Sequence, residues 1–132
     1  MVDVIKALDL DYISTNPGSS FRSLHESLIN YGENRKPELL TCTHEEAAIA
    51  MAHGYAKAAG KPMGAMIHGT VGLQHGSMAI YNAWVDRVPI MATSTSAAAP
   101  SCIIGSSPLL KRGPFCAFFH QAARVAGSRS FV

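Results

Sequence analysis

The sequence predicts an α/β protein built on an open, doubly wound parallel sheet. Hydrophobic residues make up 48% of the 132-residue chain and charged residues 15%, which suits one domain whose sheet is buried on both faces. From residue 2 to about residue 92, short β-prone runs alternate with longer helical patterns, as βαβ units do. Because parallel strands need a crossover connection, and this connection is right-handed, the order implies one sheet covered by helices.

The first βα unit follows a short helical segment over residues 2–8. Residues 11–15 have the composition of a strand, which ends in the turn Asn16-Pro17-Gly18-Ser19-Ser20. Apolar side chains then recur at helical spacing as far as Gly32. This pattern predicts a second helix that stops at the glycine.

The second unit begins with a strand over residues 38–42. The sequence Thr43-His44-Glu45-Glu46 fits the S/T-x-x-E capping box, in which Thr43 is the N-cap and Glu46 its reciprocal partner. The helix that follows is rich in alanine and runs to Gly60. Its small side chains would let it lie close to a neighbouring backbone.

The third unit comprises a strand over residues 63–67, a turn, and a helix over residues 71–84, and a fourth strand follows over residues 88–92. Ligands of doubly wound sheets bind beyond the carboxyl ends of the strands. We therefore expect the three loops after the first three strands to converge on one site. These loops are residues 16–20, 43–46 and 68–72.

Within these loops, Glu45 and Glu46 are adjacent carboxylates at a predicted helix start. Both could simply favour the positive end of the helix, each contributing about 0.3–1 kcal/mol. The capping box assigns a local role to Glu46 and none to Glu45. Glu45 is therefore the stronger candidate for a functional carboxylate.

Seven short motifs in the same order and spacing resemble a known enzyme family. They are Asn16-Pro17-Gly18-Ser19, His44-Glu45-Glu46-Ala47-Ala48, His53-Gly54-Tyr55-Ala56, Gly60-Lys61-Pro62, His68-Gly69-Thr70-Val71-Gly72, Asn82-Ala83-Trp84 and Val88-Pro89-Ile90. Together they resemble the N-terminal pyrimidine-binding domain of thiamine diphosphate-dependent enzymes of the acetolactate synthase and benzoylformate decarboxylase type. The resemblance covers about residues 5 to 92 and implies a flavodoxin-like fold, incomplete in this chain, with a partial pyrimidine-binding domain over residues 1–93.

The resemblance also implies roles for individual residues. Glu45 corresponds to the glutamate that hydrogen-bonds the ring nitrogen of the cofactor's aminopyrimidine and so activates the cofactor. This role needs a desolvated carboxyl whose pKa can rise toward neutrality, which burial against alanines would supply. Gly69 and Gly72 fall at the cofactor-binding helix start of the family.

Three further residues are candidates for contact with the substrate. Ser19 and His68 fall where the family keeps a serine and a histidine that contact the substrate and relay protons, and His44 borders the cofactor site. The residues by themselves leave simpler interpretations open: turn chemistry or a helix cap for Ser19, and a backbone hydrogen bond for His68. For His44, an exposed or locally satisfied imidazole is the usual outcome.

The implied cofactor is thiamine diphosphate, with Mg²⁺ held by a diphosphate-binding domain. The family marks that domain with Gly-Asp-Gly followed some 25 to 30 residues later by Asn-Asn, and this chain has neither motif. We therefore expect a diphosphate-binding domain or subunit as partner, a homo- or hetero-oligomer, and no activity of the chain alone. The expected chemistry is decarboxylation or carboligation of 2-keto acids.

Two alternatives remain open at the level of the sequence. The chain could be the small subunit of a split-domain 2-keto-acid decarboxylase, since some family members divide these domains between chains. It could also be a non-catalytic α/β oligomerisation domain, with Glu45 only a helix-start carboxylate.

Residues 94–132 differ from the rest of the chain. They contain four basic residues and no acidic one, whereas residues 1–93 contain nine acidic and seven basic residues. The α/β pattern and the resemblance both stop there, so we expect an unassigned basic tail. A reading frame that shifts near residues 91–96, in a gene fragment, would explain the change.

Several other functional classes are disfavoured by the sequence. The three cysteines have neither disulfide-framework nor zinc spacing, and alanine at position 48 breaks an H-E-x-x-H zinc motif. Neither G-x-G-x-x-G nor a P-loop is present. With no signal peptide and no apolar run near 20 residues, we expect a cytoplasmic protein that binds neither nucleic acid nor membrane.

Overall fold

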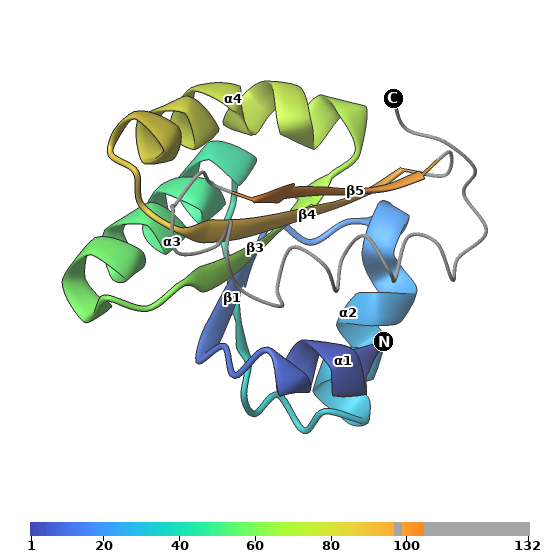
Figure 1. The fold of residues 1–132 in the computed structure, drawn as a ribbon. Helices are drawn as coiled ribbons and strands as arrows, with labels where there is room; N and C mark the ends of the chain where they lie inside the picture. Colours follow the sequence, from blue (N-terminus) through green and yellow to red (C-terminus); the bar gives the residue numbers. More distant parts are fainter. Residues whose placement is uncertain (97–98, 105–132) are drawn as a thin grey trace.

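The computed structural model describes residues 1–96 and 99–104, which contain a five-stranded sheet of order β2-β1-β3-β4-β5 (Figure 1). The strands are β1 Tyr12–Thr15, β2 Glu38–Thr41, β3 Met63–His68, β4 Ile90–Ser96 and β5 Ala99–Ile104. The first four run parallel, and β5 pairs antiparallel with β4. The predicted doubly wound, flavodoxin-like α/β sheet is confirmed.

Helices cover both faces of this sheet, as Figure 1 shows. They are α1 Val2–Ala7, the 3-10 turn η1 Ser19–Phe21, α2 Arg22–Asn30, α3 Glu45–Ala59 and α4 Thr70–Val85. The helices α1 and α2 lie over one face, and α3 and α4 lie over the other. Among the described residues, no helix has the length and apolarity needed to span a bilayer.

The strand β3 supplies side chains to both apolar layers. Ala65 and Ile67 are buried with α3 and α4, whereas Met66 points to the layer of α1 and α2. This alternation follows from the two-residue period of a strand. Since β3 lies between β1 and β4 and is buried on both faces, it forms the centre of the core.

Close packing brings α3 against β1, as its alanines predict. Ala48 and Ala52 are fully buried, and the Ser14 hydroxyl donates to the Ala48 carbonyl oxygen at 2.6 Å. A buried hydrogen bond of this kind contributes about 1 kcal/mol. The contact fixes the start of α3 relative to the carboxyl end of β1, where the candidate site lies.

The sheet extends further than the sequence pattern predicts. The strand β4 continues to Ser96 rather than ending at residue 92, and β5 follows within the predicted tail. These segments are rich in serine, threonine and alanine and lack apolar alternation. Pairing with a neighbouring strand, and not local pattern, therefore defines them: the end of β4 pairs with β3, and β5 pairs with β4. The rest of the predicted tail, residues 97–98 and 105–132, lies outside the described residues.

Candidate functional site

The loops after β1, β2 and β3 converge at the carboxyl edge of the sheet, as predicted. Glu45 begins α3 there and is only 3% exposed, which makes it the one buried charged side chain of the described residues. Asn16, from the loop after β1, hydrogen-bonds its carboxylate. From α4, His75 places Nδ1 3.5 Å from Glu45 Oε2.

The start of α4 comes very close to Glu45. A Cβ built on Gly72 would lie 3.0 Å from Glu45 Oε1 and 2.9 Å from His68 Cβ. Real Cβ atoms essentially never come as close as the His68 contact, and the contact with the carboxylate would be tighter than nine in ten real ones. The absence of a side chain at Gly72 therefore leaves room for the carboxylate beneath α4. Gly69 is the N-cap of α4, and its cofactor-binding role stays a prediction.

The pKa of Glu45 does not rise as the sequence led us to expect. Burial raises the pKa of this carboxyl, but hydrogen bonds from its own backbone N–H, from Asn16 and from His75 lower it by more. The pKa therefore lies below its ordinary value. The prediction of desolvation was correct, but the donors around the charged form were not foreseen.

The predicted capping box at the start of α3 is wrong. The N-cap is His44, whose Nδ1 accepts from the backbone N–H of Glu46 at 3.2 Å, and Thr43 lies outside the helix. An imidazole nitrogen with a free lone pair can accept this bond as a hydroxyl does. The distinction between the two glutamates survives for a different reason, because Glu45 is buried and Glu46 is exposed.

His68 ends β3 and is held by the loop after β1. Its Nδ1 lies 2.9 Å from the Ser20 hydroxyl, and its ring packs against Phe21 with the centroids 5.3 Å apart. A Cβ on Gly18 would overlap the imidazole. The serine in hydrogen-bond contact with His68 is thus Ser20, while the predicted Ser19 begins η1 and its substrate role stays a prediction.

Two residues of this cluster were not among the predicted site residues. Asn16 is the first residue after β1, a position that the rule for ligand sites indicates. His75 lies one turn beyond Gly72 in α4, and its ring stacks on His44 with the centroids 4.8 Å apart. No sequence motif marks His75, because its neighbours come from a different helix.

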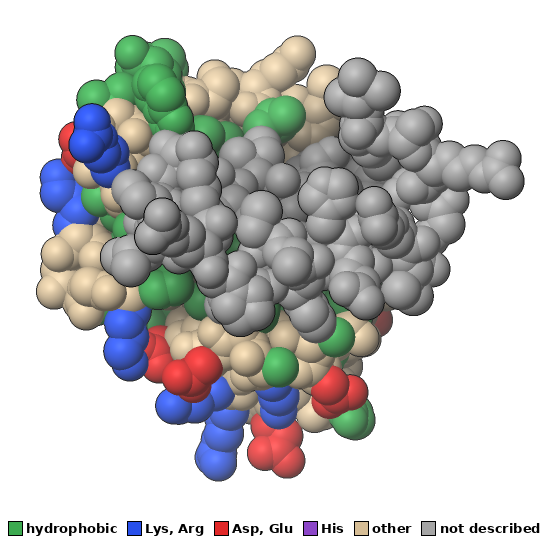
Figure 2. All heavy atoms as spheres, viewed as in Figure 1, with side chains coloured by type: hydrophobic (Ala, Val, Ile, Leu, Met, Phe, Trp, Pro, Cys, Tyr) green, Lys and Arg blue, Asp and Glu red, His purple; other side chains and the backbone are tan. Residues whose placement is uncertain are grey.

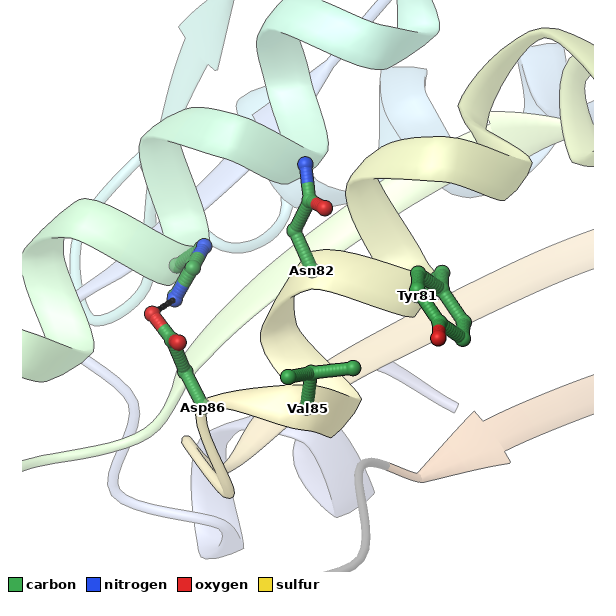
Figure 3. Close-up of a pocket in the computed structure, with 5 residues that line it drawn as sticks. Tyr81, Asn82, Val85 and Asp86 are labelled. Atoms are coloured by element: carbon green, nitrogen blue, oxygen red, sulfur yellow. Dashed lines mark hydrogen bonds and ion pairs between the residues drawn. The ribbon is translucent and has the colours of Figure 1, made fainter.

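A depression of about 410 Å³ lies at the other end of α3 and α4 (Figure 3). Its lining is His53, Tyr81, Asn82, Val85 and Asp86. Asp86 Oδ2 lies 3.0 Å from His53 Nε2 and 2.7 Å from Lys57 Nζ, and Lys57, then His53, lowers the pKa of Asp86.

These ion pairs join α3 to the end of α4. His53 lies eight positions after Glu45 in α3, which is about 12 Å along the helix. The depression is therefore not part of the Glu45 site. A second depression of about 390 Å³ lies on the solvent side of the α3 start, lined by His44, Glu46, Ala47 and Ala50.

Comparison with known proteins gives one family and a consistent set of structures. The sequence model described as "thiamine pyrophosphate enzyme, N-terminal TPP binding domain" matches residues 1–108. This match extends past the boundary that we expected at residue 93. No curated protein matches the chain.

Among solved structures, the chain is similar to an enzyme from Mycobacterium smegmatis described as thiamin diphosphate-dependent, with 26% identity and a TM-score of 0.63. Both the benzoylformate decarboxylase of Polynucleobacter necessarius and the 4-hydroxybenzoylformate decarboxylase of Rhodococcus jostii RHA1 have TM-scores of 0.63, at 20% and 21% identity. At this identity the two decarboxylases support the fold alone. The alignments cover 71–72% of this chain and 17–18% of those chains.

Proposed function

Because the chain belongs to the thiamine pyrophosphate enzymes through their N-terminal TPP-binding domain, we propose that it supplies the pyrimidine-binding half of an active site acting on 2-keto acids. The observation that carries the proposal is Glu45, a buried carboxylate at the carboxyl edge of the sheet. A carboxylate with only a structural role is seldom buried unless an oppositely charged side chain is buried with it.

The residues at this edge fit the pyrimidine end of thiamine diphosphate. A carboxylate suits a ring nitrogen that can carry a proton, and Gly72 keeps the surroundings of Glu45 Oε1 free of a side chain. At the same edge, Thr15 Oγ1 is a buried hydroxyl with no hydrogen-bond partner in the described part of the chain. When bound, the cofactor supplies the carbanion chemistry.

The proposed task of Glu45 is to hold a proton at the ring nitrogen of the aminopyrimidine. In the chain alone, donors to the carboxylate keep its pKa low. A ring nitrogen of the cofactor could replace one of these donors, and a partner domain could exclude water. The effect of burial would then outweigh that of the remaining donors, and the pKa of Glu45 would rise. The protonated acid then becomes accessible near neutral pH.

The remaining candidates surround this carboxylate. Ser20 and Phe21 hold the His68 imidazole at this edge. The proposed role of His68 is proton exchange with a substrate, which suits a histidine because the ordinary pKa of this residue type is near neutrality. We assign substrate contacts to Ser19 and His44, and contact with the cofactor to the backbone at Gly69 and Gly72.

The proposal requires a partner that holds the diphosphate and Mg²⁺. The chain spans less than one fifth of the solved proteins it resembles. On the outer side of α4 lie exposed Val71, Met78, Tyr81 and Trp84, each more than half accessible, and such a patch is typical of a surface that another protein covers. We infer an oligomeric assembly in the cytoplasm, with lyase or acetolactate synthase-like transferase activity, in which this chain by itself is inactive.

Co-expression with a diphosphate-binding domain tests the proposal. We expect 2-keto-acid decarboxylation by the wild-type complex with thiamine diphosphate and Mg²⁺, and a loss of at least about 100-fold in kcat for Glu45→Gln. The matched control is Glu46→Gln, which changes an exposed neighbour and should retain activity. Equal activity of Glu45→Gln and wild type in the intact complex would favour the oligomerisation domain instead.

A further inference from the structure

We propose that His44, Glu45 and His75 form a binding site for a divalent transition-metal ion, with Zn²⁺ as the best match. One donor atom from each of these residues lies within 4.8 Å of the other two. His44 and Glu45 come from the start of α3, and His75 comes from α4. Sequence spacing predicts no metal site here, because the donors are brought together by the packing of two helices.

The donor set selects the class of ion. Two imidazoles and one carboxylate are a zinc-type set that leaves a fourth position for water, and imidazole disfavours Mg²⁺ and Ca²⁺, which prefer oxygen ligands. In a tetrahedral zinc site with bonds near 2.0–2.2 Å, the donors lie about 3.3 Å apart. Closing the present cluster onto an ion therefore requires side-chain shifts of about 1 Å or slightly more.

The two histidine side chains can make this adjustment. Glu45 is held in place by burial, whereas the side chain of His75 is 52% exposed and His44 is also exposed. The two imidazoles already stack with only 16° between their planes. His44 gives up at most its bond from the Glu46 N–H, either by binding the ion through Nδ1 or by changing tautomer to bind through Nε2.

Metal binding would have a direct consequence for the proposed function. Glu45 cannot coordinate an ion and hold a proton at a pyrimidine nitrogen at the same time. Zn²⁺ would therefore compete with cofactor activation, and this consequence alone rests on the proposed function. Binding of the ion itself can be measured without cofactor, substrate or partner.

The test measures Zn²⁺ affinity of the full chain without a polyhistidine tag, by competition with a chromophoric chelator. Because Cys102 and Cys116 add thiols elsewhere in the sequence, the measurement is repeated with both replaced by serine. We expect one Zn²⁺ per chain in this background, and at least a tenfold weaker affinity for His75→Gln and for Glu45→Gln. The matched control is His25→Gln, a histidine on α2 whose replacement should leave the affinity unchanged.

Cobalt provides a second readout, since the intensity of its visible absorption reports coordination geometry. Co²⁺ should give a four-coordinate spectrum in wild type that His75→Gln abolishes, while circular dichroism shows the same fold for both. Equal Zn²⁺ affinity of wild type, His75→Gln and Glu45→Gln would overturn the site. That result would leave the proposed role of Glu45 untouched, because the activity comparison of Glu45→Gln with Glu46→Gln tests it separately.

Discussion

Glu45 lies between influences that oppose one another. Burial favours the neutral acid, while the first turn of α3 and the donors from Asn16 and His75 favour the carboxylate. In the chain alone the donors prevail. The same position can therefore serve as a resting anion and become an acid when a ligand displaces a donor.

Gly72 should matter because of what a side chain there would meet. Alanine gains about 0.8–1 kcal/mol of helix propensity over glycine, but its Cβ would press on Glu45 Oε1 and His68 Cβ, and overpacking costs about 1–3 kcal/mol. The matched control is Gly54→Ala in α3, where a Cβ would meet nothing within 4 Å. We expect chemical denaturation to show a higher free energy of unfolding for Gly54→Ala than for wild type. The free energy of unfolding of Gly72→Ala should be about 1–3 kcal/mol lower than that of Gly54→Ala. An equal gain in both variants would show that the space beside Glu45 is not tight.

At the scale of elements, Tyr55 links α3 to the residue before β1 through a hydrogen bond. Its hydroxyl donates to Asp11 Oδ2 at 2.7 Å, Lys61 Nζ lies 3.5 Å from the same oxygen, and its ring meets Tyr12 edge-on at 5.4 Å. The Tyr55 hydrogen bond, and after it Lys61, lowers the pKa of Asp11. Asp11 in turn raises the pKa of Tyr55 to about 12.

This contact should make stability depend on pH at both extremes. Because the folded pKa of Asp11 is lowered, its stabilisation is complete above the ordinary value of 3.8 and is lost as pH falls through the folded pKa. Because the folded pKa of Tyr55 is raised, its stabilisation is complete below 10 and is lost as pH rises toward about 12. Tyr55→Phe keeps the ring and removes the hydroxyl. We expect the difference in unfolding free energy between wild type and Tyr55→Phe to be constant from about pH 5 to 9 and to shrink outside that range. A difference that does not change at low pH would contradict the assignment for Asp11.

The elements that the sequence predicted well are those with a strong local signal. Apolar periodicity, the turn at residues 16–20 and the glycine stop at Gly60, which adopts a positive φ of 67°, are all encoded within a few residues. The strand β5 has no such signal, because its sequence Ala-Pro-Ser-Cys-Ile-Ile lacks the two-residue period of a strand, and it becomes a strand by pairing with β4. The predicted N-cap, Thr43, lies one residue before the observed one, His44, because histidine is not part of any common capping motif.

The same distinction explains what could be predicted of the site. Glu45 follows β2, His68 ends β3 and both lie in family motifs, so their convergence follows from topology. The contacts of His75 with Glu45 and of Ser20 with His68 depend on how α4 and η1 pack, over separations of 30 and 48 residues in sequence. Packing of this kind is set by whole side chains and not by any periodic pattern.

At the scale of the whole molecule, the two helical layers differ in what they show to solvent. Figure 2 shows hydrophobic side chains gathered at the upper left, over the end of α4. The exposed apolar residues Met78, Tyr81 and Val85 recur at helical spacing on that helix and are 53–59% accessible. The fully buried residues of the same helix, Ala79 and Ala83, are small, with Leu73 and Ile80 partly buried beside them, so several of the larger apolar side chains of α4 face outward.

Outward-facing apolar residues should contribute to association rather than to folding. We expect Met78→Glu combined with Tyr81→Glu to weaken binding of a diphosphate-binding chain at least tenfold, because charges then enter the centre of a desolvated interface. The unfolding temperature of the chain alone should stay nearly unchanged, since both side chains are already more than half exposed. Ile29→Glu on α2 is the control, which introduces one charge at a 43% exposed apolar residue on the other helical layer. Sedimentation velocity of the mixed chains measures the association. Equal binding by the α4 variant and the Ile29 variant would show that α4 is not part of the interface.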